Sequence, residues 1–148
     1  MAKASSRIEL AAPAADVWQL VGGFDSLPCW LPFIPQSKLS EGGRVRHLVG
    51  PGGAVIVERL MSFDERARSY TYHILQSPFP QKDYLSTLKV RSVDGSDNCI
   101  VEWSGEFTPD GATEQEVSAL FQSMYDDGLK SLKARFEVTE SVQRVCAE

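Results

Sequence analysis

The chain has 148 residues, the length of one ordinary domain, and we expect a single domain over residues 1–148. Apolar residues make up 43% and charged residues 24%, as in globular proteins with a substantial core. The net charge of −5 argues against a nucleic-acid surface. No apolar run approaches the ~20 residues of a membrane-spanning helix. The N-terminal MAKASSRIEL has no signal-peptide core, so we expect a cytoplasmic protein.

The first third of the chain predicts a strand followed by two short helices. Residues 5–12 alternate enough to form the strand. Pro13 suits the first turn of a helix, where its missing N–H is not needed, and the glycine pair 22–23 ends that helix. Asp25 or Ser26 caps a second short helix, which two following prolines stop.

The rest of the chain predicts antiparallel strands and then one long helix. β-Branched and aromatic runs separated by turn residues predict strands over 44–49, 54–64, 69–77, 83–93 and 99–107. Thr113 and Glu116 fit a capping box, and apolar residues then recur at helical spacing to about Thr139. This order predicts an α+β fold in which a curved antiparallel sheet of six to seven strands wraps around the long C-terminal helix.

Several local strings occur in an order that resembles a known superfamily. They are VWQLVGGFDSLPCWLPFI, VERLMSFDE, YTYHIL, DYLSTLKV and VEWSGEFTPDG. Their order and spacing resemble the START-like (SRPBCC) superfamily with the helix-grip fold, which includes bacterial polyketide cyclase/dehydrase-type proteins and plant abscisic-acid receptors. The resemblance implies a large apolar cavity between sheet and long helix that holds a hydrophobic small molecule.

Strand alternation, the helical stripe and the match to the plant receptors together name the side chains expected at this cavity. They are Trp30, Leu31, Phe33, His47, Glu58, Tyr72, Ile74, Tyr84, Ser86, Trp103, Phe121, Met124 and Gly128. The aromatic residues among them can equally pack the core. On the last strand the apolar alternation places Trp103 inward, whereas direct matching to the receptors would place Glu102 there.

The polar candidates allow more than one role. Glu58 lies among apolar residues, where it can accept a ligand hydroxyl or act as a general base. Alternatively, it forms a salt bridge on an exposed edge, either in the neighbourhood of Arg59 or with Arg46. His47 can transfer protons or be a hydrogen-bonded core residue. Gly128 can leave room for a ligand or pack closely against a strand. Arg44 and Arg46 predict a solvated strand face.

These features favour a binding protein over an enzyme. Leu31 stands where the plant receptors carry the lysine that anchors the hormone carboxylate, so hormone sensing of that type is not expected. The glycine-rich segment 50–53 can form a mobile gate over the cavity. The sequence has no P-loop, dinucleotide fingerprint, nucleophile elbow or metal-ligand spacing, so we expect neither cofactor nor metal.

We therefore expect a carrier or sensor of a lipid, polyketide or aromatic molecule. One alternative is a cyclase/dehydrase-type enzyme in which Glu58 or His47 handles protons in the cavity, although no strong catalytic constellation is visible. A second alternative is an interaction module that uses the loop rim to hold a protein partner. The ligand and the oligomeric state are left open.

Overall fold

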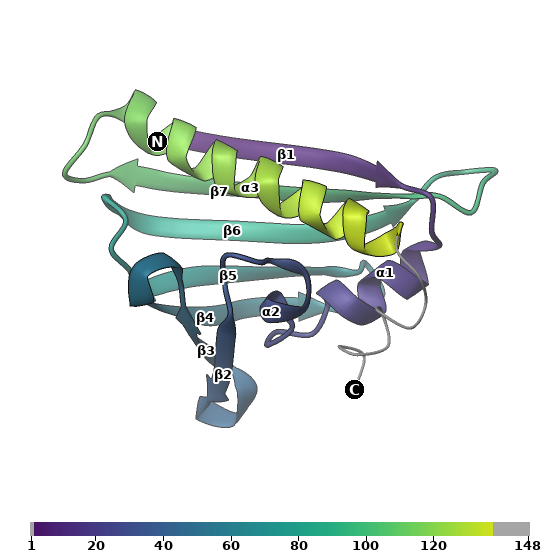
Figure 1. The fold of residues 1–148 in the computed structure, drawn as a ribbon, viewed down its shortest axis with the longest axis horizontal. Helices are drawn as coiled ribbons and strands as arrows, with labels where there is room; N and C mark the ends of the chain where they lie inside the picture. The colour runs from purple at the N-terminus through teal and green to yellow at the C-terminus, as the bar shows by residue number, and fades with distance from the viewer. Residues whose placement is uncertain (1, 138–148) are drawn as a thin grey trace.

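Seven antiparallel strands form one curved sheet in the computed structural model, which describes residues 2–137 (Figure 1). The strands are β1 (Ala2–Leu10), β2 (Gln36–Ser40), β3 (Val45–Val49), β4 (Val55–Asp64), β5 (Ser69–Gln76), β6 (Gln81–Ser92) and β7 (Cys99–Pro109). Their order across the sheet is β1-β7-β6-β5-β4-β3-β2. Strands β2 to β7 each pair with their neighbours in the chain, and β1 pairs with β7. The predicted antiparallel α+β fold is confirmed.

The helices also follow the prediction. They are α1 (Ala14–Val21), α2 (Leu27–Trp30) and α3 (Glu114–Phe136), with short 3-10 turns η1 (Glu41–Gly43) and η2 (Pro51–Gly53). The capping box at the start of α3 is present, because Thr113 N donates to Glu116 Oε1 and Glu116 N donates to Thr113 Oγ1, each at 3.1 Å. Helix α3 ends at Phe136, and the predicted end at Thr139 lies outside the described residues.

The helices divide the concave face of the sheet between them (Figure 1). Helix α3 runs along β1 and β7, and Gln122 binds the edge strand β1 by accepting from Ser5 N at 3.2 Å and donating to Ser5 O at 2.6 Å. Helix α1 packs Trp18 against Phe63 of β4, with ring centroids 5.4 Å apart. Trp18 also donates a hydrogen bond to Glu65. The core lies between the three helices and the sheet.

The register of β7 agrees with the apolar alternation. Cys99, Val101, Trp103 and Phe107 are buried on the concave side. Glu102 lies on the outer face, where its Oε1 is 3.2 Å from Arg91 Nε. Trp103 rather than Glu102 therefore points inward.

The predicted register of β3 is wrong by one position. Arg46 and Leu48 are buried, whereas His47 is exposed and its Nε2 lies 2.8 Å from Ser40 Oγ. The expected placement of His47 on an inward face and of Arg46 on a solvated face is thus reversed. The reason is a cross-strand partner, because β3 pairs with β4 in a register that sets Arg46 opposite Glu58.

Strand β2 has no counterpart among the predicted strands. Its sequence, QSKLS, is short and mostly polar, as edge strands often are, and it carries little of the alternation on which strand prediction depends. It nevertheless completes the sheet by pairing with β3 from Gln36 to Ser40.

Candidate functional site

A narrow cavity lies between the concave face of the sheet and α3. Most of the predicted site residues line it, namely Leu31, Phe33, Glu58, Tyr72, Ile74, Tyr84, Trp103, Phe121 and Met124. They are joined by Leu27, Ile34, Arg46, Leu48, Ile56, Phe79 and Tyr125. The wall is therefore largely apolar and aromatic, with one cation, one carboxylate and several hydroxyl groups set into it.

The cavity is much smaller than the resemblance implies. The centre of a water molecule fits within only about 30 Å³ of it, which is room for about two waters. Aromatic rings fill the remaining space. The ring centroids of Tyr84 and Phe121 lie 4.8 Å apart, and those of Trp103 and Tyr125 lie 4.7 Å apart. The expectation of a large preformed cavity is therefore wrong for this structure.

Two predicted site residues pack behind the wall. Trp30 is buried with its ring edge-on to Trp103, at a centroid distance of 5.6 Å. A Cβ atom at Gly128 would lie 2.7 Å from the Trp103 ring and 2.8 Å from the Leu31 side chain. Gly128 therefore permits close packing of α3 and does not leave room for a ligand.

Two further predicted residues also lie away from the cavity. Ser86 is fully buried, where its Oγ donates to Ser104 O at 2.7 Å and accepts from Trp103 Nε1 at 3.2 Å. It supports the tryptophan instead of facing the cavity. His47 lies on the outer face of the sheet, so its proposed proton-transfer role in the cavity is excluded.

The main polar feature of the wall is a buried ion pair between Arg46 and Glu58. Arg46 is 1% exposed and Glu58 is 7% exposed. Arg46 Nε donates to Glu58 Oε1 at 2.8 Å, and Nη2 lies 2.8 Å from the same oxygen. The adjacent strands β3 and β4 place the two residues directly opposite each other. A buried charge requires such a partner.

Aromatic rings and oxygen atoms enclose the Arg46 guanidinium. Its Cζ lies 4.2 Å from the ring centroid of Phe24 and 4.7 Å from that of Tyr72. Nη1 donates to Phe24 O at 3.0 Å and to Tyr70 OH at 3.3 Å. These cation–π and hydrogen-bond contacts hold the cation in place with most of its donors already in use.

Burial shifts the pKa values of both members of the pair. It raises the pKa of the Glu58 carboxyl above its ordinary value, and the charge and hydrogen bond of Arg46 only partly oppose that shift. For Arg46, burial alone would lower the pKa, but Tyr70 and Glu58 raise it above its ordinary value, so the guanidinium stays charged. Glu58 is therefore the titratable member of the pair.

A chain of hydroxyl groups forms a second polar feature. Trp103 Nε1 donates to Tyr72 OH at 3.0 Å, Tyr72 OH lies 3.5 Å from Tyr84 OH, and Tyr84 OH is hydrogen-bonded to Tyr125 OH. Burial raises the pKa of Tyr125 to about 12 and the pKa values of Tyr72 and Tyr84 well above their ordinary value. The phenols are therefore uncharged near neutral pH and can donate hydrogen bonds.

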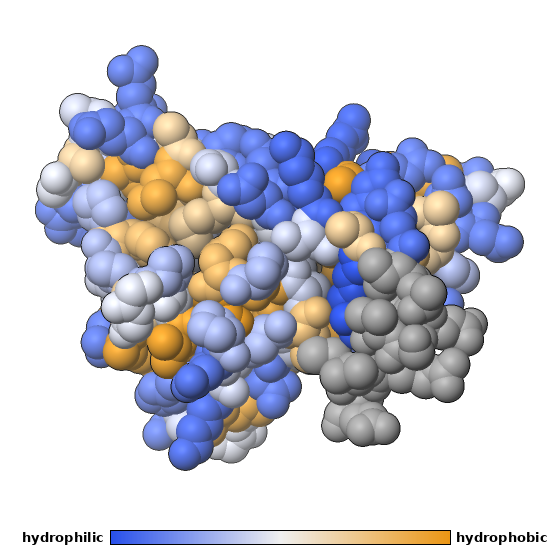
Figure 2. All heavy atoms as spheres, viewed as in Figure 1, coloured by the Kyte–Doolittle hydropathy of each residue, from blue (hydrophilic) through white to orange (hydrophobic). Residues whose placement is uncertain are grey.

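The rim of the cavity is apolar. Phe33, Phe79 and Met124 line the cavity but are only partly buried. Figure 2 shows apolar side chains gathered over the left half of this face, between the start of α3 and the η2 turn. These side chains lie at the mouth of the cavity, and any ligand larger than a few waters would have to displace side chains of the wall.

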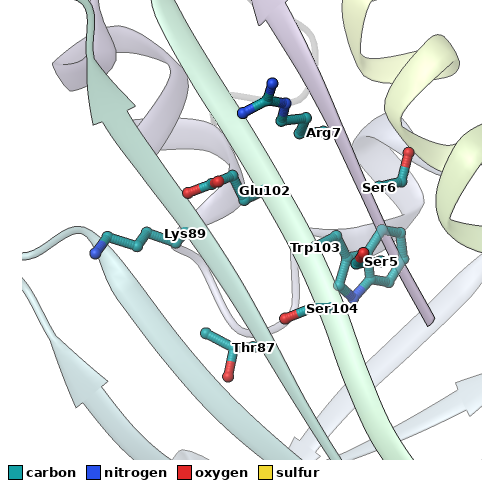
Figure 3. Close-up of a pocket in the computed structure, with 8 residues that line it drawn as sticks. All are labelled: Ser5, Ser6, Arg7, Thr87, Lys89, Glu102, Trp103 and Ser104. Atoms are coloured by element: carbon teal, nitrogen blue, oxygen red, sulfur yellow. The ribbon is translucent and has the colours of Figure 1, made fainter. Parts of the chain in front are cut away.

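A larger hollow lies on the outer face of the sheet (Figure 3). It measures about 410 Å³ and is lined by residues of β1, β6 and β7, including Arg7, Lys89 and Glu102. It opens to solvent. Its charges are of both signs, and Glu102 is already paired with Arg91 at 3.2 Å. This hollow therefore offers less specific binding chemistry than the inner cavity.

Other kinds of site find little support in the part of the chain that the structure describes. Residues 2–137 contain no group of three His, Cys, Asp or Glu side chains placed to hold a metal ion. Within the same range, no helix is both long enough and apolar enough to span a membrane.

Sequence reasoning missed Arg46, Tyr70 and Tyr125 as residues of the site. Tyr125 lies one turn after Phe121 on α3, so the helical spacing of the sequence could have predicted that it faces the cavity. Arg46 lies opposite the inward Glu58 on the neighbouring strand, and predicting this position requires the pairing register of the two strands. Tyr70 lies two residues before the inward Tyr72 on β5, so the period of two in a strand could have predicted that both face the same side.

Comparisons with known proteins agree with the fold. A family model described as polyketide cyclase / dehydrase and lipid transport matches residues 1–137. The protein XoxI from Bacillus cereus is 50% identical, with a TM-score of 0.90 over 93% of this chain and 96% of that chain.

More distant structures share the fold alone. A START superfamily protein from Mycobacterium smegmatis is 18% identical, with a TM-score of 0.77 over 93% of this chain and 98% of that one. The Zhui aromatase/cyclase from Streptomyces sp. R1128 is 16% identical, with a TM-score of 0.74 over 91% of this chain and 93% of that one. The chain belongs to the family described as polyketide cyclase / dehydrase and lipid transport, and it has a START-like fold.

Proposed function

We propose that this protein binds a hydrophobic or amphipathic small molecule in the cavity between the sheet and α3, as a carrier or sensor. The observation that carries the proposal is the buried pair of Arg46 and Glu58 in an otherwise apolar and aromatic wall. A few polar groups converging in an apolar pocket are typical of sites that orient small molecules. Such a pair adds little to stability compared with apolar packing, so a binding role accounts for its presence.

The small cavity sets a condition on this proposal. Because the cavity holds about two waters, a ligand must first displace side chains of the rim. Phe33, Phe79 and Met124 are the partly buried residues available to move. Binding is therefore coupled to movement of these side chains.

The direct experiment is to identify a molecule that co-purifies with the protein. The purified protein is denatured and extracted, and the extract is analysed by mass spectrometry. Neighbouring residues on β5 offer a matched pair of variants, because Ile74 lines the cavity and Leu75 is exposed on the outer face. Ile74→Trp fills the cavity and should lose the molecule, whereas Leu75→Trp should retain it.

Circular dichroism checks that both variants fold, and Ile74→Phe replaces Ile74→Trp if the larger ring prevents folding. Finding no bound molecule in the wild type, or equal retention by both variants, would contradict the proposal.

A second candidate function is an enzyme of the cyclase/dehydrase type. It is favoured by Glu58, a buried carboxyl whose raised pKa suits a general base, close to a chain of tyrosine hydroxyl groups. Glu58→Gln separates the two functions once the ligand is known. If Glu58 only orients the ligand, affinity should fall by about 1–2 kcal/mol. If it is a general base, turnover should fall by roughly 100-fold or more while binding survives.

A further inference from the structure

We propose that the ligand of this cavity is uncharged and donates a hydrogen bond, from an alcohol or phenol, to Oε2 of Glu58. This inference rests on the proposed binding function and adds the chemical class of the ligand. It excludes carboxylate and phosphate compounds as the preferred ligands. The argument depends on which hydrogen-bonding groups of the ion pair are already in use.

The cation of the pair is not available to an anion. Phe24 and Tyr72 cover the Arg46 guanidinium with their rings, at 4.2 and 4.7 Å from Cζ. Its Nη1 donates to Phe24 O and Tyr70 OH, and its Nε donates to Glu58. An anionic ligand would therefore have to displace Glu58 from Arg46.

The carboxylate of the pair is more accessible than the cation. The Glu58 side chain is 9% exposed and that of Arg46 is 1% exposed. Among the described residues, both contacts from Arg46 to Glu58 reach Oε1. Oε2 is thus the acceptor that remains for a ligand, and its partner must supply an O–H or N–H group.

The charge balance of the wall opposes an ionised ligand, because any net charge on the ligand would stay uncancelled in an apolar surrounding. Arg46 and Glu58 are the only charged residues among the described residues that line the cavity, and together their charges cancel. An anion would meet the carboxylate oxygen in an apolar surrounding, with no free cation to compensate its desolvation.

The tyrosine chain supports a hydroxyl group in particular. Three phenols linked in a row use two of their protons within the row and leave one to donate. The cavity wall therefore offers an acceptor at Glu58 and a donor from Tyr72, Tyr84 or Tyr125. An alcohol or phenol can satisfy both, because its oxygen accepts while its proton is donated.

Three probes of nearly equal size test the inference. 2-Naphthol is a neutral donor, 2-naphthoate is an anion at pH 7, and naphthalene has neither property. Binding to the wild type is measured by titration calorimetry or by quenching of tryptophan fluorescence. We expect 2-naphthol to bind about tenfold or more tightly than either other probe, the effect of one hydrogen bond to a charged group.

Glu58→Gln should reverse this preference. The amide oxygen of the new side chain will accept from Arg46, and its NH₂ group will then face the cavity as a donor. The change also leaves Arg46 with an uncancelled positive charge. The variant should therefore bind 2-naphthoate more tightly than 2-naphthol. Glu102→Gln is the matched control, because it removes one carboxylate from the outer face and should leave the preference unchanged.

The outcomes separate this inference from the proposed function. If none of the three probes binds, the binding function itself fails. If the wild type binds 2-naphthoate as tightly as 2-naphthol, or if Glu58→Gln binds them in the wild-type order, the inference is overturned while the binding function stands. The relative affinities of the wild type for 2-naphthol and 2-naphthoate test the inference even if the Glu58 variant does not fold.

Discussion

Replacing Arg46 with methionine should strongly destabilise the fold, and replacing Glu58 as well should restore most of the loss. Methionine keeps the apolar stem of the arginine side chain but removes the guanidinium group and its charge. Glu58 then remains buried at 7% exposure without the cation that lies 2.8 Å from its Oε1. Arg46→Met also removes the contacts of the guanidinium with Phe24 and Tyr72.

The expected magnitudes follow from these contacts. Removing one member of a buried pair costs about 3–5 kcal/mol, because it leaves an uncompensated buried charge. Glu58→Leu should cost a similar amount by leaving Arg46 unpaired. The double variant Arg46→Met/Glu58→Leu should lie within about 2 kcal/mol of the wild type, since apolar residues of similar volume often replace such pairs without loss. Because the two single losses sum to about 6–10 kcal/mol, the coupling free energy should be at least about 4 kcal/mol.

Urea unfolding followed by tryptophan fluorescence measures all four proteins. The exposed pair Arg91 and Glu102 provides a control cycle, because its side chains are 42% and 38% exposed at a distance of 3.2 Å. Its coupling should be no more than about 1 kcal/mol. Equal coupling in both cycles, or a double variant as unstable as the sum of the single variants, would refute the account of the buried pair.

Three further predictions concern stability. Gly105→Ala should cost about 1–3 kcal/mol in urea unfolding, because its Cβ would clash with Tyr125 OH, and Tyr125→Phe should recover most of this loss; no recovery would contradict the clash. Gly128→Ala should lower the melting temperature because its Cβ meets Trp103 at 2.7 Å; a rise would refute the packing role. As pH rises above 4.5, the free energy of unfolding of the wild type should fall relative to that of Glu58→Gln by up to about 1.4 kcal/mol per pH unit. The reason is that the folded state keeps the Glu58 proton to higher pH than the unfolded state does. A difference in stability that does not change with pH would contradict the raised pKa.

Sequence features that act over a few residues were sufficient to predict most of the fold. The glycine pair 22–23, the capping box at Thr113 and the turns between strands each act over a few residues, so their sequence determines where an element begins or ends. Antiparallel pairing then followed from consecutive strands with short connections. Alternation placed Trp103 inward, whereas the inward positions of Glu58, Tyr72 and Tyr84 came from alternation together with the resemblance to the plant receptors.

Strand β3 shows the limit of this reasoning. Val45 and Val49 share their parity with His47, so alternation favoured the wrong face. The true register places Arg46 inward because Glu58 neutralises it from the next strand. The sequence of one strand does not identify the residue that lies opposite on the neighbouring strand. The two members of a buried ion pair are therefore each predicted to be surface charges.

The size of the cavity was unpredictable for a related reason. It depends on how rings from several elements fit together, such as Tyr84, Trp103, Phe121 and Tyr125. Residue patterns identify which side chains face inward, but not how much space remains between them. The family resemblance implied a large cavity, whereas packing in this chain leaves about 30 Å³.

The most direct test of the binding function is a methyl NMR titration of the full chain with 2-naphthol. Leu31, Ile74 and Met124 line the cavity, and Leu75 and Leu85 are exposed on the outer face. The account predicts that the signals of the cavity methyl groups shift saturably, while those of the two outer leucines stay unchanged. Unchanged cavity signals up to the solubility limit of the probe, or shifts confined to the outer leucines, would contradict it.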